Sequence, residues 1–362
     1  MNRAVFKAAS LLLVLVCFAI SVSCSDSSLD LTGVEANGYK VARGRSFSYQ
    51  TQSRKTYISN VTIDSYLSRA ISVPVEIGGD TYDMLPGEGS TIAATPDGSM
   101  MFLSRNLPSP LVVFFNPMLG GDRAPDFTLS SDGSGGVLKA GIIFYDHIQD
   151  CLYVQDGNFG SGNELRVFYA WDNASELTAD RAPDRVFRIL DPDAQSSYFR
   201  IEGFTVCPET DDLVVVTDDP AYAIIENAST LTGDITPANV VDYYWSIINL
   251  SRASLVLHCA YDGPDDILYI DHTGGDMRLL KFDGASARTG MQQITPIVLD
   301  VFTNYCSGLR LDMANDRLFY ACSNGSLLLY DEVSAITASP TYSHRFDLTD
   351  DMRSFGIWFE EE

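Results

Sequence analysis

A short phrase occurs twice in this chain at a fixed spacing, and it limits the possible folds more than any other feature. Asn173-Ala-Ser-Glu-Leu-Thr178 recurs as Asn227-Ala-Ser-Thr-Leu-Thr232, 54 residues later. The prolines that follow, Pro183 and Pro237, are also 54 residues apart. Self-similarity at such a period predicts an array of one small unit in place of one irregular core. Within this phrase we expect Asn173 or Ser175 to cap a single helical turn.

Each unit begins with a short apolar strand, continues through a tight polar turn and returns in a second apolar strand. Two further apolar strands follow, and Val, Ile, Leu, Tyr and Phe dominate all four, as half-buried strands favour. The five turns are 95–99, 146–150, 208–211, 262–266 and 312–316. The second strands are predicted at 100–103, 151–154, 213–216, 267–270 and 318–320. The third are predicted at 111–115, 165–169, 221–225, 277–282 and 326–330, and the fourth at 127–129, 186–189, 240–243, 297–301 and 342–346.

Four antiparallel strands repeated every 40–60 residues predict an all-β fold, the β-propeller. The ends of the chain supply one more unit, because 354–359 reads as a first strand and 46–50, 56–61 and 70–77 read as second to fourth strands. A C-terminal strand that joins the N-terminal blade would close the ring and protect its edges. We therefore favour six four-stranded blades, with five or seven as alternatives, in a single domain over 46–362.

The hairpin pattern and the Asn-Ala-Ser connections resemble the NHL and YncE-like group of bacterial propellers. The resemblance covers about 46–359 and extends to the gluconolactonase-like propellers. It implies a propeller fold, but binding modules and enzymes share these marks, so it says little about activity.

The N-terminal segment 1–23 is typical of a signal peptide. Arg3 and Lys7 precede an apolar run over 8–20 that is too short to span a membrane, and small residues follow it. Cys24 comes next, so the segment resembles a bacterial lipoprotein signal in which Cys24 becomes the lipidated first residue. The alternative is ordinary secretion with Cys24 left as a thiol. We expect a flexible tether over 24–45 and a place in the bacterial cell envelope, as an outer-membrane or periplasm-facing lipoprotein.

The formal net charge is −24, and 36 of the 48 acidic residues are Asp. Such a surface repels nucleic acid and anionic lipid, so we expect no nucleic-acid partner and membrane contact only through the lipid anchor. Asp favours turns, which accounts for part of this bias. A saline habitat or cation binding are alternative explanations for the rest.

The seven cysteines contain no C-x-x-C pair. If Ala314 is the centre of the last hairpin, Cys306 and Cys322 face each other on neighbouring strands, and we predict a disulfide between them. For the other cysteines of the domain we expect buried thiols.

In a propeller, the loops between second and third strands share one face with the connections between blades. Four carboxylates are predicted near that face, namely Asp156, Asp218, Asp271 and Glu202. Converging oxygen ligands of this kind suit calcium or another divalent cation. The alternative is that these residues only serve turn geometry. His272 is a weak candidate for a general base beside Asp271, and otherwise an exposed loop histidine.

No assembled catalytic motif accompanies the repeat. The leading hypothesis is a non-enzymatic, envelope-anchored module that binds a protein or glycan partner on the loop-rich face. Tyr198, Phe199, Tyr244 and Trp245 lie in the connections between blades and suit such a surface, or else cover the blade interfaces. The alternative is a metal-dependent hydrolase of the gluconolactonase or lactonase type, built on the four carboxylates with His272.

Overall fold

The structure is a computed structural model that describes a defined part of the chain. The described residues are 41–50, 55–64, 75–77, 92–104, 110–116, 124–156, 167–192, 201–217, 220–244, 258–274, 276–295, 297–298, 306–322, 326–337, 342–347 and 352–359. The chain divides into two compact units, Met1–Val41 with Asp64–Leu67, and Ala42–Ile63 with Ser68–Glu362. Apart from the strand-end residues Val41 and Asp64, the second unit holds the sheets. Among the described residues, no helix has the length and apolar character needed to cross a membrane.

Five sheets each contain four antiparallel strands from one stretch of the chain, and we number these blades 1 to 5. Blade 1 contains β4 (Ile92–Ala94), β5 (Met100–Leu103), β6 (Leu111–Phe115) and β7 (Phe127–Leu129). Blade 2 contains β8 (Ala140–Asp146), β9 (Cys151–Asp156), β10 (Val167–Asp172) and β11 (Arg185–Ile189). Blade 3 contains β12 (Ile201–Cys207), β13 (Asp212–Thr217), β14 (Ala221–Glu226) and β16 (Val241–Tyr244). Blade 4 contains β17 (Cys259–Asp262), β18 (Ile267–Gly274), β19 (Asp276–Asp283) and β21 (Ile297–Val298). Blade 5 contains β22 (Cys306–Asp312), β23 (Arg317–Cys322), β24 (Ser326–Asp331) and β25 (His344–Asp347).

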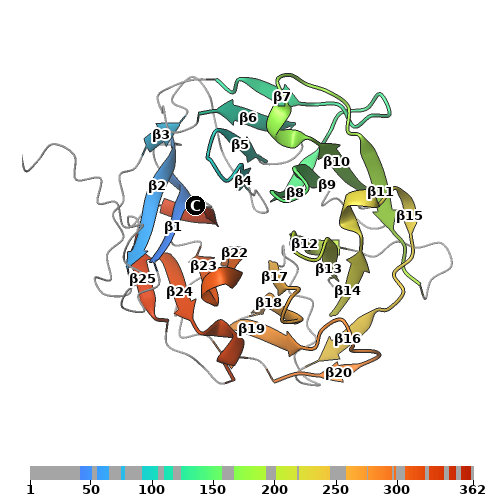
Figure 1. Cartoon of the computed structure of the whole chain (residues 1–362), viewed down its shortest axis with the longest axis vertical. Coiled ribbons are helices and arrows are strands. Elements are labelled where there is room, and N and C mark those ends of the chain that lie inside the picture. Colours follow the sequence, from blue (N-terminus) through green and yellow to red (C-terminus); the bar gives the residue numbers. More distant parts are fainter. Residues whose placement is uncertain are drawn as a thin grey trace, which may run out of the picture. The chain divides into compact units, whose positions relative to one another are not determined.

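A sixth sheet combines both ends of the chain. Its strand order is β26 (Met352–Phe359), β1 (Val41–Gln50), β2 (Lys55–Asp64) and β3 (Val75–Ile77), and β26 runs antiparallel to β1. The innermost strands contact one another in a closed circle: β4 with β8, then β12, β17, β22 and β26, which contacts β4 again. Figure 1 shows the sheets arranged like this around a central axis. The predicted β-propeller, closed by the C-terminal strand, is confirmed.

The described hydrophobic core lies between the blades, because neighbouring sheets among blades 1 to 5 pack their faces against each other. Four clusters of buried side chains join blade 1 to blade 2, blade 2 to 3, blade 3 to 4 and blade 4 to 5. Between blades 2 and 3, the ring of Phe168 meets the edge of Phe204 at 5.1 Å between centroids. Every residue of β8 is buried, as expected for a strand that is covered on both sides. No single blade could bury this surface alone.

The turn between the first two strands has four residues in blades 2 to 5, and its last residue is always Asp. Asp150, Asp211, Asp266 and Asp316 adopt φ values of 49°, 56°, 54° and 52°. Asp tolerates this left-handed conformation better than most residues with a Cβ atom, because its short side chain can hydrogen-bond locally.

Each of these aspartates binds a serine that follows the third strand of the same blade, and we call this contact the Asp–Ser clamp. One carboxylate oxygen accepts the serine N–H at 2.8–2.9 Å, and the other accepts the serine Oγ–H at 2.6–2.8 Å. The pairs are Asp150–Ser175, Asp211–Ser229, Asp266–Ser286 and Asp316–Ser334. The clamp therefore fixes the chain after the third strand to the first hairpin.

The repeated phrase of the sequence is the serine side of this clamp. Asn173 and Asn227 both adopt left-handed backbone conformations, and neither side chain caps the following 3-10 turn, η3 (Ala174–Glu176) or η4 (Ala228–Thr230). The predicted helical turn is thus confirmed, but the expected capping by the Asn173 side chain is wrong, because the Asn residues serve the backbone conformation. In blades 4 and 5, Gly284 and Glu332 take the same conformation, so the unit recurs there without the Asn.

Two short strands connect neighbouring blades at their outer edges. β15 (Gly233–Ile235), from the connection of blade 3, pairs in parallel with β11 of blade 2. β20 (Gln292–Gln293), from the connection of blade 4, pairs in parallel with β16 of blade 3. These additions cover outer edge strands that would otherwise offer unpaired backbone groups to another chain.

The clamp predicts a measurable energetic coupling. Ser229→Ala removes one hydrogen bond to a carboxylate and is expected to lower the free energy of unfolding by about 1–2 kcal/mol. Asp211→Ala removes both hydrogen bonds and is expected to cost about 2–4 kcal/mol. Denaturant unfolding of the two single variants and the double variant gives the coupling, which we expect to be about 1 kcal/mol or more.

The control is Thr230→Ala, in the same 3-10 turn. Its hydroxyl donates to the carbonyl of Asn227 on the exposed surface, so its loss is expected to cost less than about 0.5 kcal/mol. Additive effects of the Asp211 and Ser229 substitutions would show that the clamp does not stabilise the blade.

Candidate functional site

The two faces of the propeller differ in their connections, which have a nearly constant length on one face and variable lengths on the other. Strand direction places the four-residue turns and the 3-10 turns on one face, which we call the turn face. The loops between second and third strands, and the connections between blades, lie on the opposite face, which we call the loop face. Second-to-third loops have seven residues in blade 1 (104–110), ten in blade 2 (157–166), three in blade 3 (218–220), one in blade 4 (Gly275) and three in blade 5 (323–325). Most of these loop residues lie outside the described part of the chain.

The four carboxylates proposed as metal ligands occupy different kinds of position. Asp271 lies within β18 and is fully buried, and Glu202 is the second residue of β12 and is also buried. Asp156 ends β9, and Asp218 lies outside the described residues. The sequence placed Asp271 and His272 in a loop, and this was wrong, because β18 continues to Gly274 and His272 pairs with Arg278 of β19.

Asp156 and Asp271 do not hold equivalent places in their blades. Counted from the left-handed Asp of each turn, Asp271 is the fifth residue after Asp266, and Asp156 is the sixth after Asp150. Successive residues of a strand point to opposite faces of the sheet, so their side chains leave their sheets on different sides. Among the described residues, no group of three or more His, Cys, Asp or Glu side chains could hold a metal ion. The calcium site stays a hypothesis.

Asp271 contributes to a contact between blades. Its Oδ1 accepts the hydroxyl of Tyr320 from blade 5 at 2.6 Å, and both residues are buried. Gln155 holds the corresponding position in blade 2, and its Nε2 donates to the carbonyl of Ile201 in blade 3 at 2.9 Å. In both blades, the fifth residue after the left-handed Asp therefore holds the adjacent blade by a hydrogen bond, which is a structural role.

The turn face gathers carboxylates from neighbouring blades. Asp146 is fully buried, and its Oδ1 accepts the N–H groups of Ile148 and Gln149 at 2.9 and 3.0 Å. Burial raises the pKa of Asp146, and the charge of Asp211 in blade 3 adds to the rise. The pKa of Asp262 is raised in the same way, by burial first and then by nearby acids of its own and adjacent blades. Like charges thus face one another across blade boundaries.

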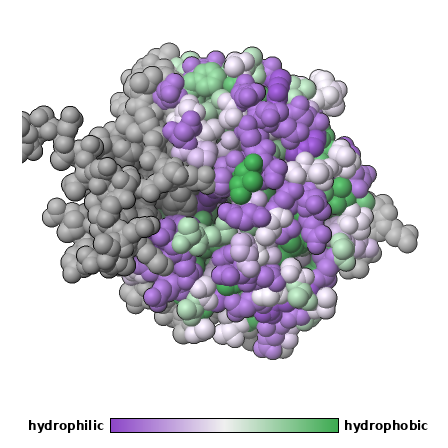
Figure 2. All heavy atoms as spheres, viewed as in Figure 1, coloured by the Kyte–Doolittle hydropathy of each residue, from purple (hydrophilic) through white to green (hydrophobic). Residues whose placement is uncertain are grey.

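The surface around the ring is correspondingly polar. Figure 2 shows that the described residues in this view are mostly hydrophilic, with hydrophobic residues as separate spots. The exposed large hydrophobic side chains in the described part are Val137, Ile148 and Met291, one each from three different connections. No apolar patch therefore marks a docking surface among these residues.

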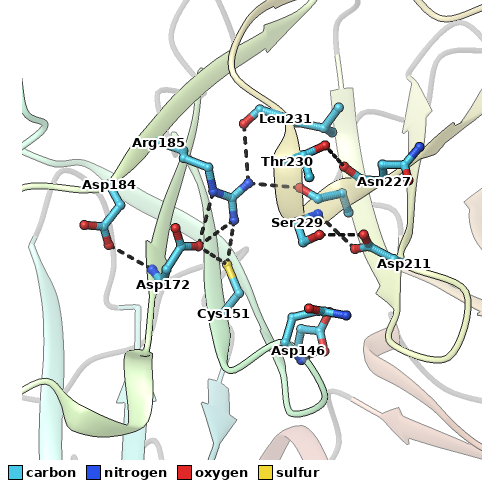
Figure 3. Close-up of polar contacts among 12 residues, drawn as sticks. Asp146, Cys151, Asp172, Asp184, Arg185, Asp211, Asn227, Ser229, Thr230 and Leu231 are labelled. Atoms are coloured by element: carbon cyan, nitrogen blue, oxygen red, sulfur yellow. Dashed lines mark hydrogen bonds and ion pairs between the residues drawn. The ribbon is translucent and has the colours of Figure 1, made fainter.

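Figure 3 shows a second polar arrangement, centred on Arg185 between blades 2 and 3. Its guanidinium donates to Asp172 Oδ1 at 2.9 Å from Nη2 and 3.2 Å from Nε, and to the sulfur of Cys151 at 3.0 Å. Nη1 donates to the carbonyls of Ala228 and Leu231 in the 3-10 turn region of blade 3, at 3.0 and 3.3 Å. Burial raises the pKa of the Cys151 thiol to about 12, so it is protonated at neutral pH and unsuited to nucleophilic attack.

The contact from Arg185 has counterparts at other blade boundaries. The hydroxyl of Tyr222 in blade 3 donates to the carbonyl of Ala285 in blade 4 at 2.9 Å. Nζ of Lys281 in blade 4 donates to the carbonyl of Ser334 in blade 5. Blades 2, 3 and 4 thus each supply a donor for turn carbonyls of the next blade, and these residues were missed from sequence. The three donors are Arg, Tyr and Lys, so they have no sequence pattern in common. What they share is the acceptor, a backbone carbonyl of the next blade.

The remaining residues singled out from sequence fall in two groups. Cys306 pairs with Cys322 in the register of β22 and β23, so the predicted facing positions are confirmed, whereas the disulfide itself stays a prediction. Tyr244 is the last residue of β16. The others, Cys24, Tyr198, Phe199 and Trp245, lie outside the described residues.

Comparisons with known proteins add little to this geometry. No protein-family model matches the chain, and no curated protein matches it. Among solved structures, the chain is similar to one from the crystal structure of the mitotic checkpoint complex, at 9% sequence identity and a TM-score of 0.45, with 85% of each chain covered. A likeness this weak carries no information about function, and the propeller assignment rests on the strand pairing.

The buried charge of Asp146 predicts an unusual pH response. Because the folded state raises this pKa, protonation favours folding, so this residue adds stability as the pH falls from neutral toward the ordinary aspartate pKa of 3.8. Asp146→Asn keeps an acceptor for the two turn N–H groups and removes the charge. We expect it to raise the melting temperature by roughly 2–4 °C at pH 8, and by less at pH 5.

Asp97→Asn is the matched control on the turn of blade 1. The hydroxyl of Thr95 and the N–H and hydroxyl of Ser99 donate to its carboxylate and lower its pKa. Removing that charge should therefore lower the melting temperature or leave it unchanged. A lower melting temperature for Asp146→Asn at pH 8 would contradict the electrostatic interpretation.

Proposed function

We propose that this propeller is a non-catalytic interaction module that binds a protein partner through its loop face. The observation that carries the proposal is the contrast between a constant and a variable face on one scaffold. The Asp–Ser clamp recurs in four blades with nearly identical distances, and the turns it holds have the same length. Rigid scaffolds with variable loops on one side are a common way for proteins to build binding surfaces.

The connections between blades, which also lie on the loop face, support the proposal that the partner binds there. They contain fourteen residues before β4, ten before β8, eleven before β12, fourteen before β17, seven before β22 and four before β26. The connections before β12 and β17 contain Tyr198, Phe199 and Trp245, and Tyr and Trp are the residues that most often dominate binding energy in protein interfaces. We favour a protein partner over a glycan because the loops differ in length from blade to blade, which suits the irregular surface of a protein.

The N-terminal sequence supports a location for this module in the bacterial cell envelope. Residues 1–23 have the pattern of a signal peptide, and Cys24 follows the small residues at the expected cleavage point. We propose that Cys24 carries lipid and that the segment from Cys24 to the start of β1 tethers the propeller to a bacterial envelope membrane; because β1 begins at Val41, this tether is shorter than the predicted 24–45. The strong negative charge of the chain would keep the propeller away from the anionic surface of that membrane.

Substitutions on the two faces should separate the binding surface from the scaffold. The full chain, tagged at its C-terminus, is used to capture partners from an envelope extract, and the captured protein is then purified and titrated. We expect Trp245→Ala or Tyr198→Ala to weaken the dissociation constant at least ~10-fold. Ile148→Ala, at a 53% exposed position of the turn face, should leave it unchanged.

Loss of binding in Ile148→Ala, with full binding in both loop variants, would move the partner to the turn face and contradict the proposal. Binding that disappears after deglycosylation of the purified partner would show a glycan ligand instead.

Lipid anchoring has its own test. Cells expressing the full chain and grown with radiolabelled palmitate should incorporate label into the protein and retain it in the membrane fraction. Cys24→Ala should abolish the label and release the protein. Absence of label in the unchanged chain would refute the anchor while leaving the propeller and its partner untouched.

A further inference from the structure

The inner hairpin of blade 5 places two cysteines in facing positions. Cys306 is the first residue of β22, Cys322 is the last residue of β23, and the two are partners in the antiparallel register. Facing residues of an antiparallel pair have Cα atoms about 4.5–5.5 Å apart and side chains on the same side of the sheet. This separation falls within the range of about 4.4–6.8 Å that disulfides span.

The pairing depends on a β-bulge that the sequence did not reveal. Near the turn, Asp312 faces Arg317, so the turn has four residues and its centre lies half a residue beyond Ala314. If that register continued along the whole hairpin, Cys306 and Cys322 would be offset by one residue and would not face each other. A shift between Cys306 and Gly308 adds one residue to β22 and brings the two cysteines opposite each other. The facing positions predicted from Ala314 were therefore correct only because two one-residue effects cancel.

The same bulge recurs in other blades, so it belongs to the architecture and not to blade 5 alone. In blade 3 the register shifts between Ile201 and Gly203, and Ile201 faces Thr217. In blade 2 it shifts between Ala140 and Ile143, and Ala140 faces Asp156. Cys306 and Cys322 occupy this repeated pair of positions in blade 5, and there both residues are cysteine.

We propose that Cys306 and Cys322 form a disulfide that ties the inner two strands of blade 5 together during folding. Cys322 is fully buried in the ring, so an oxidant must reach it before the blades close. The thiolate of one cysteine attacks the disulfide of an oxidant, such as glutathione disulfide or a thiol oxidoreductase. The oxidant's S–S bond breaks, one of its sulfurs leaves as a thiol, and the other stays bound to the cysteine as a mixed disulfide. The second thiolate then displaces the oxidant's other sulfur as a thiol. Two protons and two electrons leave the protein, and the oxidant is reduced to two thiols.

The position of this bond suggests what it stabilises. β22 contacts β17 of blade 4 on one side and β26, the strand that closes the ring, on the other. A covalent bond at the loop-face end of β22 would hold this strand in place for β26 to pack against. The bond encloses fifteen residues, 307–321, so its loss should lower the melting temperature by roughly 5 °C.

The test begins with the unchanged full chain, refolded in a mixture of reduced and oxidised glutathione. Remaining thiols are alkylated under denaturing conditions, and the tryptic peptides are identified by mass spectrometry. The expected product joins peptide 289–310, which contains Cys306, to peptide 318–345, which contains Cys322. Recovery of both peptides in alkylated form, or a cross-link of either one to a different cysteine, would overturn the proposal.

Stability measurements provide the second arm. The melting temperature of the refolded chain should fall by roughly 5 °C on reduction, while that of Cys306→Ser should not respond to reductant. Cys259→Ser is the control, because its thiol is buried between blades 3 and 4 and should leave the response intact. Equal responses of the unchanged chain and Cys306→Ser would contradict the proposal. None of these outcomes depends on the proposed partner, so failure of one proposal leaves the other standing.

Discussion

The Asp–Ser clamp is the contact on which the regularity of this propeller depends. A blade of four short strands must return its chain to the same place each time, or the next blade cannot stack on it. The aspartate at the end of the turn does this with one carboxylate, which accepts two hydrogen bonds from a serine after the third strand. A carboxylate is suited to this because its hydrogen bonds are stronger than those of a neutral acceptor. The same residue also tolerates the left-handed backbone that ends the turn.

The clamp and its turns also account for part of the chain's acidity. Turn aspartates are needed in each blade for their conformation and hydrogen bonding, and all of them gather on the turn face. The cost is mutual repulsion and desolvation, which is visible in the raised pKa values of Asp146 and Asp262. Cations at the blade boundaries offset part of this charge. Arg185 and Lys281 pair with Asp172 and Asp283 within their own blades while donating to the carbonyls of the next blade.

Function in such a scaffold depends on the residues that are not needed to build and stack the blades. Buried polar side chains near the loop-face ends of the second strands, such as Gln155 and Asp271, bind the adjacent blade. We therefore propose that the chemistry that distinguishes this chain comes from loop residues beyond the strand ends. The four carboxylates proposed as metal ligands were aligned by loop position. Strand register separates Asp156 from Asp271, because a shift of one residue turns a side chain to the other face of the sheet.

The sequence by itself determined the repeat, the strand order and the closure by the C-terminal strand. These follow from local patterns, namely apolar runs, turn residues and a recurring phrase, and each is written within a few adjacent residues. It also placed Cys306 opposite Cys322, although by a register that the structure replaces with a longer turn and a bulge. Only the tertiary structure decided that the phrase is a clamp, that its Asn residues serve a left-handed backbone, and that Arg185, Tyr222 and Lys281 share one role. Those features join residues from different strands or blades, and their partners are defined by packing in three dimensions, which leaves no fixed spacing along the chain.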